Sequence, residues 1–219
     1  MFNTESELVD FFIKKQSKKK NRIIVTELST NYGRPDIVEI VYSERILQKR
    51  RNYVNKFERI QTDRIDSYIL TFLYGKSWVN AETILRNMNI NKLTLNRVLE
   101  RLELRGLILV LEGKIKLNGK SNVLAIKQLN VYEAKLSNWK YVIEQAERHL
   151  WFSNNTSILL PELSDKIFNK CYSACKQREI GFILANEEKM NTIHAQTSKT
   201  LINTPLLWEL NEKLIDGSL

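Results

Sequence analysis

Histidine and cysteine are scarce in this sequence, and their scarcity argues against a zinc protein. The two cysteines, Cys171 and Cys175, lie one turn apart within a predicted helix, whereas the two histidines, His149 and His194, are far from each other in the chain. A structural zinc site needs four such ligands gathered at one place. We therefore expect the cysteines to be reduced, partly buried thiols.

Long apolar runs are missing as well. No run approaches the roughly 20 residues that a membrane-spanning helix needs, and the first residues lack the basic start, apolar stretch and small-residue cleavage site of a secretory signal. The 219 residues are 43% hydrophobic and 27% charged, which is typical of a globular protein with one core and room for a small second module. We expect a cytoplasmic protein without a membrane partner.

Acidic residues are too few to balance the basic ones in one part of the chain. Residues 43–120 hold 16 lysines and arginines against 8 aspartates and glutamates, whereas residues 1–42 hold 7 against 6 and residues 121–219 hold 11 against 11. Nearly the whole net charge of +9 therefore belongs to the middle segment. A basic segment on a neutral body indicates a polyanionic partner, with DNA or RNA ahead of acidic lipid, although a merely solvated basic face gives the same count.

The same middle segment has the pattern of a small helical module. After a polar, basic linker, apolar spacing predicts a helix from about residue 63, a short helix capped by Asn80, and a strong helix that starts near Lys92 and stops at Gly106. Two short strands then flank a turn at Glu112 and Gly113. Three short helices followed by a β-hairpin resemble a winged helix-turn-helix over residues 63–118.

In winged helices that bind DNA, the third helix enters the major groove and the hairpin touches the backbone. The resemblance therefore implies side chains that face nucleic acid on the third helix and the hairpin, namely Lys92, Thr94, Asn96, Arg97, Arg101, Lys114 and Lys116. A winged helix used for protein contacts or dimerisation is the alternative, and the local positive charge favours nucleic acid.

The flanking segments have a different pattern, in which strands alternate with helices. Before residue 43 the order is helix, strand, a loop with Gly33 and Pro35, and a strand at residues 36–42. After residue 120 the order is strand, helix, strand, helix, strand and a short terminal helix. We therefore predict one discontinuous α/β domain, residues 1–42 and 121–219, into which residues 43–120 are inserted.

Two charged motifs mark strand ends in this α/β domain. The stretch GRPDIVEI at residues 33–40 places Asp36 at the start of a strand, and VYEAKL at residues 131–136 places Glu133 and Lys135 on one face of another. With the element order, they resemble the PD-(D/E)XK nuclease superfamily, whose restriction-endonuclease-like fold is a mixed sheet flanked by helices. The acidic-x-Lys pattern recurs at residues 112–114 and 187–189, but only the copy at 133–135 closes an apolar strand and precedes an amphipathic helix.

The resemblance implies a metal-dependent catalytic site. Cleaving a phosphodiester needs a hard cation, and Mg²⁺ (or Mn²⁺) prefers oxygen ligands, of which usually only one or two are carboxylates. Asp36 and Glu133 would be those carboxylates, and the backbone carbonyl of Ala134 a third ligand. Lys135 would position or deprotonate the attacking water and stabilise negative charge. The structural alternative is that Asp36 caps a turn while Glu133 and Lys135 form a surface ion pair.

Further site residues are implied by the resemblance alone. Glu7, or its competitor Glu5, matches an additional acidic metal ligand on the first helix, and Gln145 matches a polar catalytic residue on the helix after the motif. Arg148 and His149 follow Gln145 and could reach phosphates, although a partly buried structural role suits His149 better.

The two motifs are unusually far apart in the chain. Asp36 and Glu133 are separated by 97 positions, where the superfamily usually has a short hairpin. A folded insertion accounts for this distance if its two ends lie close together.

The predicted function is metal-dependent hydrolysis of DNA by an endonuclease whose inserted winged helix holds or selects double-stranded DNA. One site cuts one strand, so a double-strand cut requires a homodimer or sequential nicks. A role in a defence or mobile-element system, together with partner proteins, is typical of the superfamily. The alternatives are a non-catalytic DNA-binding regulator built on a retired nuclease fold, an RNA-cleaving or RNA-binding protein, and a protein-interaction adaptor.

Overall fold

The chain folds into two units, each made from two separate stretches of sequence. Unit 1 contains residues 1–42 and 127–202, and unit 2 contains residues 43–126 and 203–219. The structure is a computed structural model that describes residues 2–17, 19–31, 33–55, 60–197 and 199–219.

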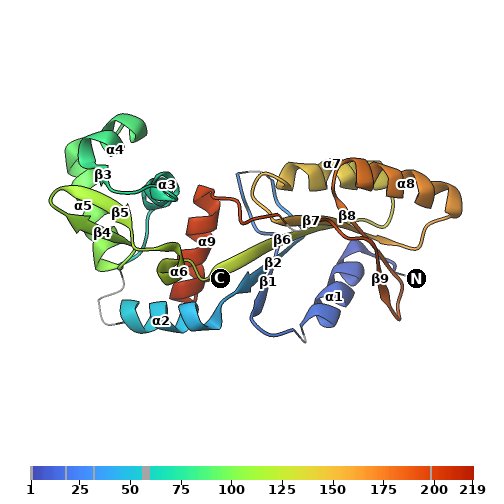
Figure 1. Cartoon of the computed structure of the whole chain (residues 1–219). Coiled ribbons are helices and arrows are strands. Elements are labelled where there is room, and N and C mark those ends of the chain that lie inside the picture. Colours follow the sequence, from blue (N-terminus) through green and yellow to red (C-terminus); the bar gives the residue numbers. More distant parts are fainter. Residues whose placement is uncertain (1, 18, 32, 56–59, 198) are drawn as a thin grey trace. The chain divides into compact units, whose positions relative to one another are not determined.

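Unit 1 is built around a mixed β-sheet with helices on both faces (Figure 1). Its elements are α1 (Glu5–Gln16), β1 (Arg22–Thr26), β2 (Ile37–Tyr42), β6 (Ile126–Ala134), α7 (Trp139–His149), β7 (Asn155–Pro161), α8 (Asp165–Gln177), β8 (Gly181–Ala185) and β9 (Met190–His194). Within the described residues the sheet has six strands in the order β1-β2-β6-β7-β8-β9. The β6-β7 and β7-β8 pairs are parallel, whereas the β1-β2 and β8-β9 pairs are antiparallel.

Alternating side chains along β7 explain why both faces of this sheet are covered. Leu159 belongs to a buried cluster with Leu8 and Phe12 of α1, on one face. Ile158 and Leu160 belong to a second cluster with α7 and α8, on the other face (Figure 1). A strand that is apolar on both faces needs cover on both, and helices supply it here.

The thiols are buried in the second cluster. Cys171 and Cys175 are free cysteines of α8 and have no exposed surface. The expected reduced thiols are therefore confirmed, and they are buried completely rather than partly.

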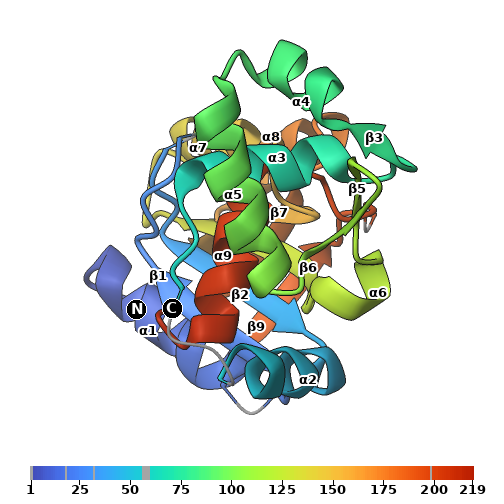
Figure 2. The same cartoon turned by 90° about the vertical axis from the view of Figure 1, so that its left-hand side faces the viewer.

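Unit 2 combines helices with a small antiparallel sheet (Figure 2). Its elements are α2 (Glu44–Val54), α3 (Arg64–Leu73), β3 (Val79–Asn80), α4 (Ala81–Met88), α5 (Lys92–Leu104), β4 (Ile108–Leu111), β5 (Lys114–Leu117), α6 (Lys120–Val123) and α9 (Pro205–Asp216). β4 and β5 form a hairpin, and β3 pairs with the other edge of β5.

Several local predictions for unit 2 are confirmed. Asn80 is the N-cap residue of α4, although its side chain makes no capping hydrogen bond, and Gly106, with a φ of 66°, follows the last residues of α5. Glu112 and Gly113 have φ values of 50° and 74°. Two successive residues with positive φ make the tight turn whose twist suits a two-residue hairpin.

Two features of unit 2 differ from the predictions. The segment expected to be a linker forms α2, because Ile46, Leu47 and Val54 make a short apolar stripe among its charged residues. The terminal helix α9, expected in the α/β domain, belongs to unit 2, where it packs against α2 and α3. Its Glu212 is 1% exposed and pairs with Arg105, also buried, at 2.6 Å.

The two ends of the inserted stretch adjoin each other. The Ser43 N–H donates to the carbonyl oxygen of Ala125 at 2.8 Å. The chain therefore leaves β2 and re-enters β6 at neighbouring points, as the separated motifs require.

Candidate functional site

The start of β2 and the end of β6 bring the two sequence motifs together. β2 and β6 are neighbours in the sheet, and Oδ2 of Asp36 accepts a hydrogen bond of 2.8 Å from the Ala134 N–H. Further along the same pair, Glu39 accepts a hydrogen bond from Asn130 at 2.7 Å, so the two strands run in opposite directions. Asp36 therefore lies directly beside the stretch that contains Glu133.

The environment of Asp36 disfavours its negative charge. The pKa of Asp36 is raised from 3.8 to about 6, and burial is the largest cause. The hydrogen bond from Ala134 and the charge of Lys135 lower this pKa, whereas the charge of Glu133 raises it. Two neighbouring carboxylates of this kind are stabilised together by a proton or by a cation.

Lys135 lies at the same strand end and carries its charge toward α1. Its Nζ lies 2.6 Å from Oε2 of Glu5, and its backbone N–H donates to the carbonyl of Leu159 at 3.1 Å. Burial lowers the pKa of Lys135, but the hydrogen bond with Glu5 and the charges of Asp36 and Glu133 outweigh burial, so the pKa is raised. A protonated lysine suits the expected role in charge stabilisation and disfavours the expected role as a base.

The two acidic candidates on α1 have different positions. Oε2 of Glu7 accepts a hydrogen bond from the Asn3 N–H at 2.7 Å, which places this carboxylate at the N-terminus of its own helix. Glu5 is the residue that contacts Lys135. The structure thus brings Glu5, the alternative to Glu7, to the motif. Glu7 instead caps the N-terminus of α1.

Glu133 is held by a histidine. Its side chain is 1% exposed, and Oε1 lies 2.7 Å from Nε2 of His149, which is 2% exposed. Within the described residues, Oε2 of Glu133 is buried without a hydrogen-bond partner. The carboxylate is therefore fixed through one oxygen and unsatisfied at the other. It is no surface ion pair with Lys135.

Two of the polar residues expected at the site, Gln145 and Arg148, differ in exposure on α7, the helix that follows the motif. Gln145 lies one turn before His149 on α7, and its Oε1 is also buried without a partner among the described residues. Arg148 is exposed. His149 is almost completely buried, which agrees with the structural role that the sequence favoured for it over a contact with phosphate.

The carboxylates at these strand ends are of the donor type that a hard cation prefers. Among the described residues no group of three or more His, Cys, Asp and Glu side chains is arranged to hold a metal ion. Mg²⁺, however, usually binds through one or two carboxylates and keeps several waters. The unsatisfied Oε2 of Glu133, with Asp36 close enough for their charges to interact, offers that smaller set.

A second buried carboxylate nearby was missed by sequence reasoning. Glu39 has no exposed surface, and it accepts hydrogen bonds from Arg22, from Asn130 at 2.7 Å and from the Tyr132 hydroxyl at 3.2 Å. Burial, followed by the charge of Glu39, raises the pKa of Tyr132 above its ordinary value. The sequence does contain one indication of this buried carboxylate, because Glu39 is an acidic residue inside the apolar stretch IVEIV. Because every oxygen of Glu39 is paired, this group is structural.

The predicted nucleic-acid residues of α5 fall into two classes. Lys92, Asn96 and Arg97 are exposed. Thr94 is partly buried, and its N–H donates to the N-cap Asn91 at 2.8 Å. The exposed side chains of Lys92, Asn96 and Arg97 are accessible to a polyanion, whereas that of Thr94 is partly covered.

Arg101 is committed to an internal ion pair. Its Nε and Nη2 donate to the two carboxylate oxygens of Asp66 at 2.7 and 2.6 Å, and Asp66 has no exposed surface. This bidentate pair ties α5 to the capping box that begins α3. Arg101 is therefore occupied by Asp66, contrary to the expectation that it faces nucleic acid.

The two lysines of the hairpin lie at its surface. Lys114 is exposed. Nζ of Lys116 lies 4.3 Å from the centre of the Trp78 ring, a cation–π arrangement on a partly exposed aromatic.

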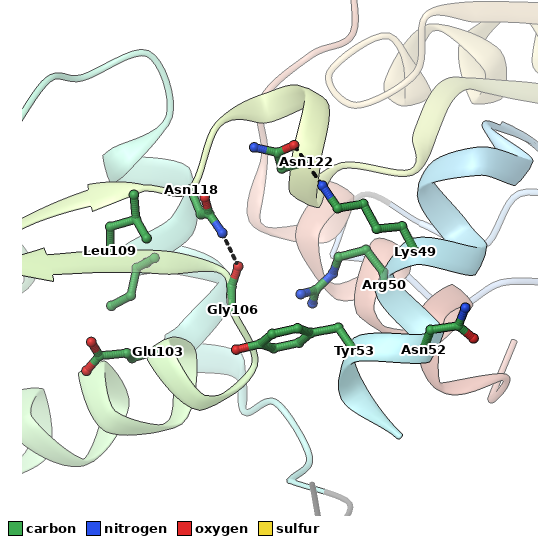
Figure 3. A pocket seen from close by; sticks show the side chains of 10 residues that line it. Lys49, Arg50, Asn52, Tyr53, Glu103, Gly106, Leu109, Asn118 and Asn122 are labelled. Carbon is green, nitrogen blue, oxygen red and sulfur yellow. Dashed lines mark hydrogen bonds between the residues drawn. The ribbon is translucent and has the colours of Figure 1, made fainter. Parts of the chain in front are cut away.

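Unit 2 also contains a cavity that no sequence motif indicated (Figure 3). Its volume is about 470 Å³, and it lies between α2 and the segment that links α5 to β4. The ring of Tyr53 packs so closely on Gly106 that a Cβ there would lie 2.7 Å from Cε1 of the tyrosine. Asn118 donates to the Gly106 carbonyl at 3.0 Å, and Lys49 donates to Asn122 at 3.2 Å. These contacts make the cavity part of the packing of unit 2.

Comparisons with known proteins add no relative. No protein-family model, curated protein or solved structure matches this chain. In the part of the chain that the structure describes, every helix is too short or too polar to cross a membrane.

Proposed function

We propose that the chain is a metal-dependent endonuclease of double-stranded DNA, in which unit 1 has the restriction-endonuclease-like fold and unit 2 is a winged-helix module. The observation that carries the proposal is the meeting of Asp36 with the Glu133-Ala134-Lys135 stretch, across 97 positions of sequence and through a 2.8 Å hydrogen bond. Carboxylates with a perturbed pKa cluster at functional sites, and Asp36 is such a carboxylate. Its position beside the triplet favours a functional role over a chance occurrence of the acidic-x-Lys pattern.

The element order of unit 1 supports the fold part of the proposal. A helix, an antiparallel strand pair, a strand that ends in the motif, a helix and a parallel strand follow one another as α1, β1, β2, β6, α7 and β7. This is the order that the superfamily resemblance implies once the insertion is removed.

Each residue then has a defined chemical task. Asp36, Glu133 and the carbonyl of Ala134 would hold a divalent cation, Mg²⁺ or Mn²⁺. When bound, the cation supplies charge neutralisation at the phosphate and lowers the pKa of the attacking water. Lys135, kept protonated by Glu5, stabilises the negative charge that develops on the phosphate. Gln145, whose side-chain oxygen is unsatisfied, orients water or substrate at the site.

Unit 2 would supply affinity for the DNA backbone. Lys92 and Arg97 on α5 and Lys114 on the hairpin are exposed cations of the segment that carries nearly all the net charge. Contacts of this type are independent of sequence and weaken steeply with salt.

Nicking of supercoiled plasmid with Mg²⁺ or Mn²⁺ tests the proposal. The native chain should convert plasmid to the open circle only with the cation, and Glu133→Ala and Lys135→Ala should each lower the rate by about 10²- to 10³-fold. Glu187→Ala, in the acidic-x-Lys triplet of the polar segment, is the matched control and should cut at the native rate.

Two other outcomes would change the conclusion. Cation-dependent nicking that survives in both variants would mean that the activity resides elsewhere. Salt-sensitive binding of duplex DNA without any nicking would favour the non-catalytic regulator.

A further inference from the structure

The imidazole of His149 has no task in the mechanism above, yet it is placed tightly against Glu133. Nε2 lies 2.7 Å from Oε1, and both side chains are almost completely buried. A carboxylate that binds a cation is ionised and can only accept hydrogen bonds, so in that state Nε2 of His149 is the donor to Oε1. Breaking this bond would leave a buried charge unpaired on that side.

The position of the imidazole is fixed from several directions. A Cβ added at Gly33, in the turn before Asp36, would lie 3.4 Å from Cε1 of His149, so the turn closes over the ring. Phe152 packs edge-on to the ring, with 5.7 Å between the ring centres. The hydroxyl of Ser153 donates to the His149 carbonyl at 2.8 Å. The donor to Glu133 is therefore held in place before any ligand arrives.

A carboxylate held by one oxygen presents its other oxygen in a fixed direction. Oε2 of Glu133 is that other oxygen, and it has no hydrogen-bond partner among the described residues. Side chains that ligate metals are commonly oriented by such a hydrogen-bonded neighbour, and loss of the neighbour typically weakens metal binding by about 10- to 100-fold.

We propose that His149 is a positioning residue, which fixes Oε1 of Glu133 and so presents Oε2 to a divalent cation. This inference rests on the proposed function, because it assigns a role at the same cation site. The positioning role depends on the hydrogen-bond donor at Nε2 and not only on the volume of the ring.

Binding of Mn²⁺ alone to the full chain, followed by the electron paramagnetic resonance signal of free Mn²⁺, tests the inference without any cleavage assay. The variants are His149→Leu, which keeps the approximate size without a donor, and His149→Gln, whose amide nitrogen can take the place of Nε2. His149→Leu should weaken Mn²⁺ binding by about 10- to 100-fold, whereas His149→Gln should bind nearly as the native chain does. Circular dichroism would establish that each variant is folded.

Glu133→Gln separates failure of this inference from failure of the proposed function. If Glu133→Gln binds Mn²⁺ as tightly as the native chain does, Glu133 is not a ligand of the cation. The proposed cation site and the role of His149 would then both be wrong. Native affinity in folded His149→Leu would overturn only the positioning role, as would equal weakening in His149→Gln and His149→Leu. Should His149→Leu fail to fold, His149→Asn replaces it, because its shorter amide cannot reach Oε1.

Discussion

Asp36 illustrates at the scale of one residue how a side chain of the candidate site can oppose stability. Its carboxylate accepts a hydrogen bond from Ala134 while burial and Glu133 raise its pKa to about 6. The folded chain therefore binds this proton more tightly than the unfolded chain does. The stability that the proton contributes is complete below about pH 4 and is lost as the pH rises through about 6.

Asp36→Asn should remove this pH-dependent penalty. The amide keeps an oxygen for the Ala134 N–H and carries no charge, so the free energy of unfolding at pH 8 should rise by about 1 kcal/mol, a figure that allows for solvent screening of a partly exposed group. Little change is expected at pH 4, where the native carboxyl is already protonated. Urea denaturation at the two pH values, without divalent cations, measures the difference.

The exposed Asp10→Asn on α1 is the matched control for that comparison. A gain for Asp36→Asn that is the same at pH 4 and pH 8 would show that the carboxylate charge is not its cause. The same variant should also lack cleavage activity, since stability and cation binding make opposite demands on this side chain.

At the scale of an element, α5 shows that one helix can hold arginines with different purposes. Arg97 is exposed, whereas Arg101, one turn later, is bound by both oxygens of the buried Asp66. Helical periodicity places the two on adjacent positions of the surface, and only the packing of α3 against α5 distinguishes them.

Alanine substitutions at the two arginines should affect different properties, stability for Arg101 and DNA binding for Arg97. Arg101→Ala leaves the buried Asp66 unpaired and should lower the free energy of unfolding by about 3 kcal/mol. Arg97→Ala should change stability by less than about 0.5 kcal/mol, but weaken binding to a duplex and reduce the salt dependence of binding by about one counterion.

Thermal unfolding and fluorescence anisotropy with a labelled duplex at several salt concentrations measure these two effects. If Arg97→Ala leaves DNA affinity and its salt dependence unchanged, α5 does not contact the backbone as proposed. If Arg101→Ala is as stable as the native chain, the pair with Asp66 contributes nothing measurable.

At the scale of the whole molecule, the chain interleaves its two units. Unit 2 starts after β2, returns the chain to β6, and is completed by α9 at the end of the sequence. Glu212 of α9 accepts hydrogen bonds from two buried arginines, Arg50 at 3.1 Å and Arg105 at 2.6 Å. The last element is therefore needed to neutralise charges buried much earlier in the chain.

Removal of residues 203–219 should unfold unit 2 and spare much of unit 1. The truncation exposes the apolar partners of Leu207, Trp208 and Leu214 and leaves Arg50 and Arg105 without their carboxylate. Limited proteolysis with peptide mapping should reveal new cleavage within residues 43–126. A chain that lacks only residues 218–219, beyond α9, is the control, and native resistance in both truncations would contradict the prediction.

Local sequence patterns determined much of this protein. The apolar spacing of residues 92–104 specified a helix, Gly106 its end, and Glu112-Gly113 the hairpin turn, because these depend on interactions within a few positions. The position of the Glu133-Ala134-Lys135 stretch at the end of a strand was also visible, since strand alternation and the following amphipathic helix are local features.

Only the tertiary structure decided which distant side chains meet. It paired Arg101 with Asp66, brought Glu5 to Lys135, placed His149 against Glu133 and joined α9 to unit 2. Each of these depends on how elements pack. Helical and strand periodicities state which face of an element is buried, but not which charge on another element will be buried beside it.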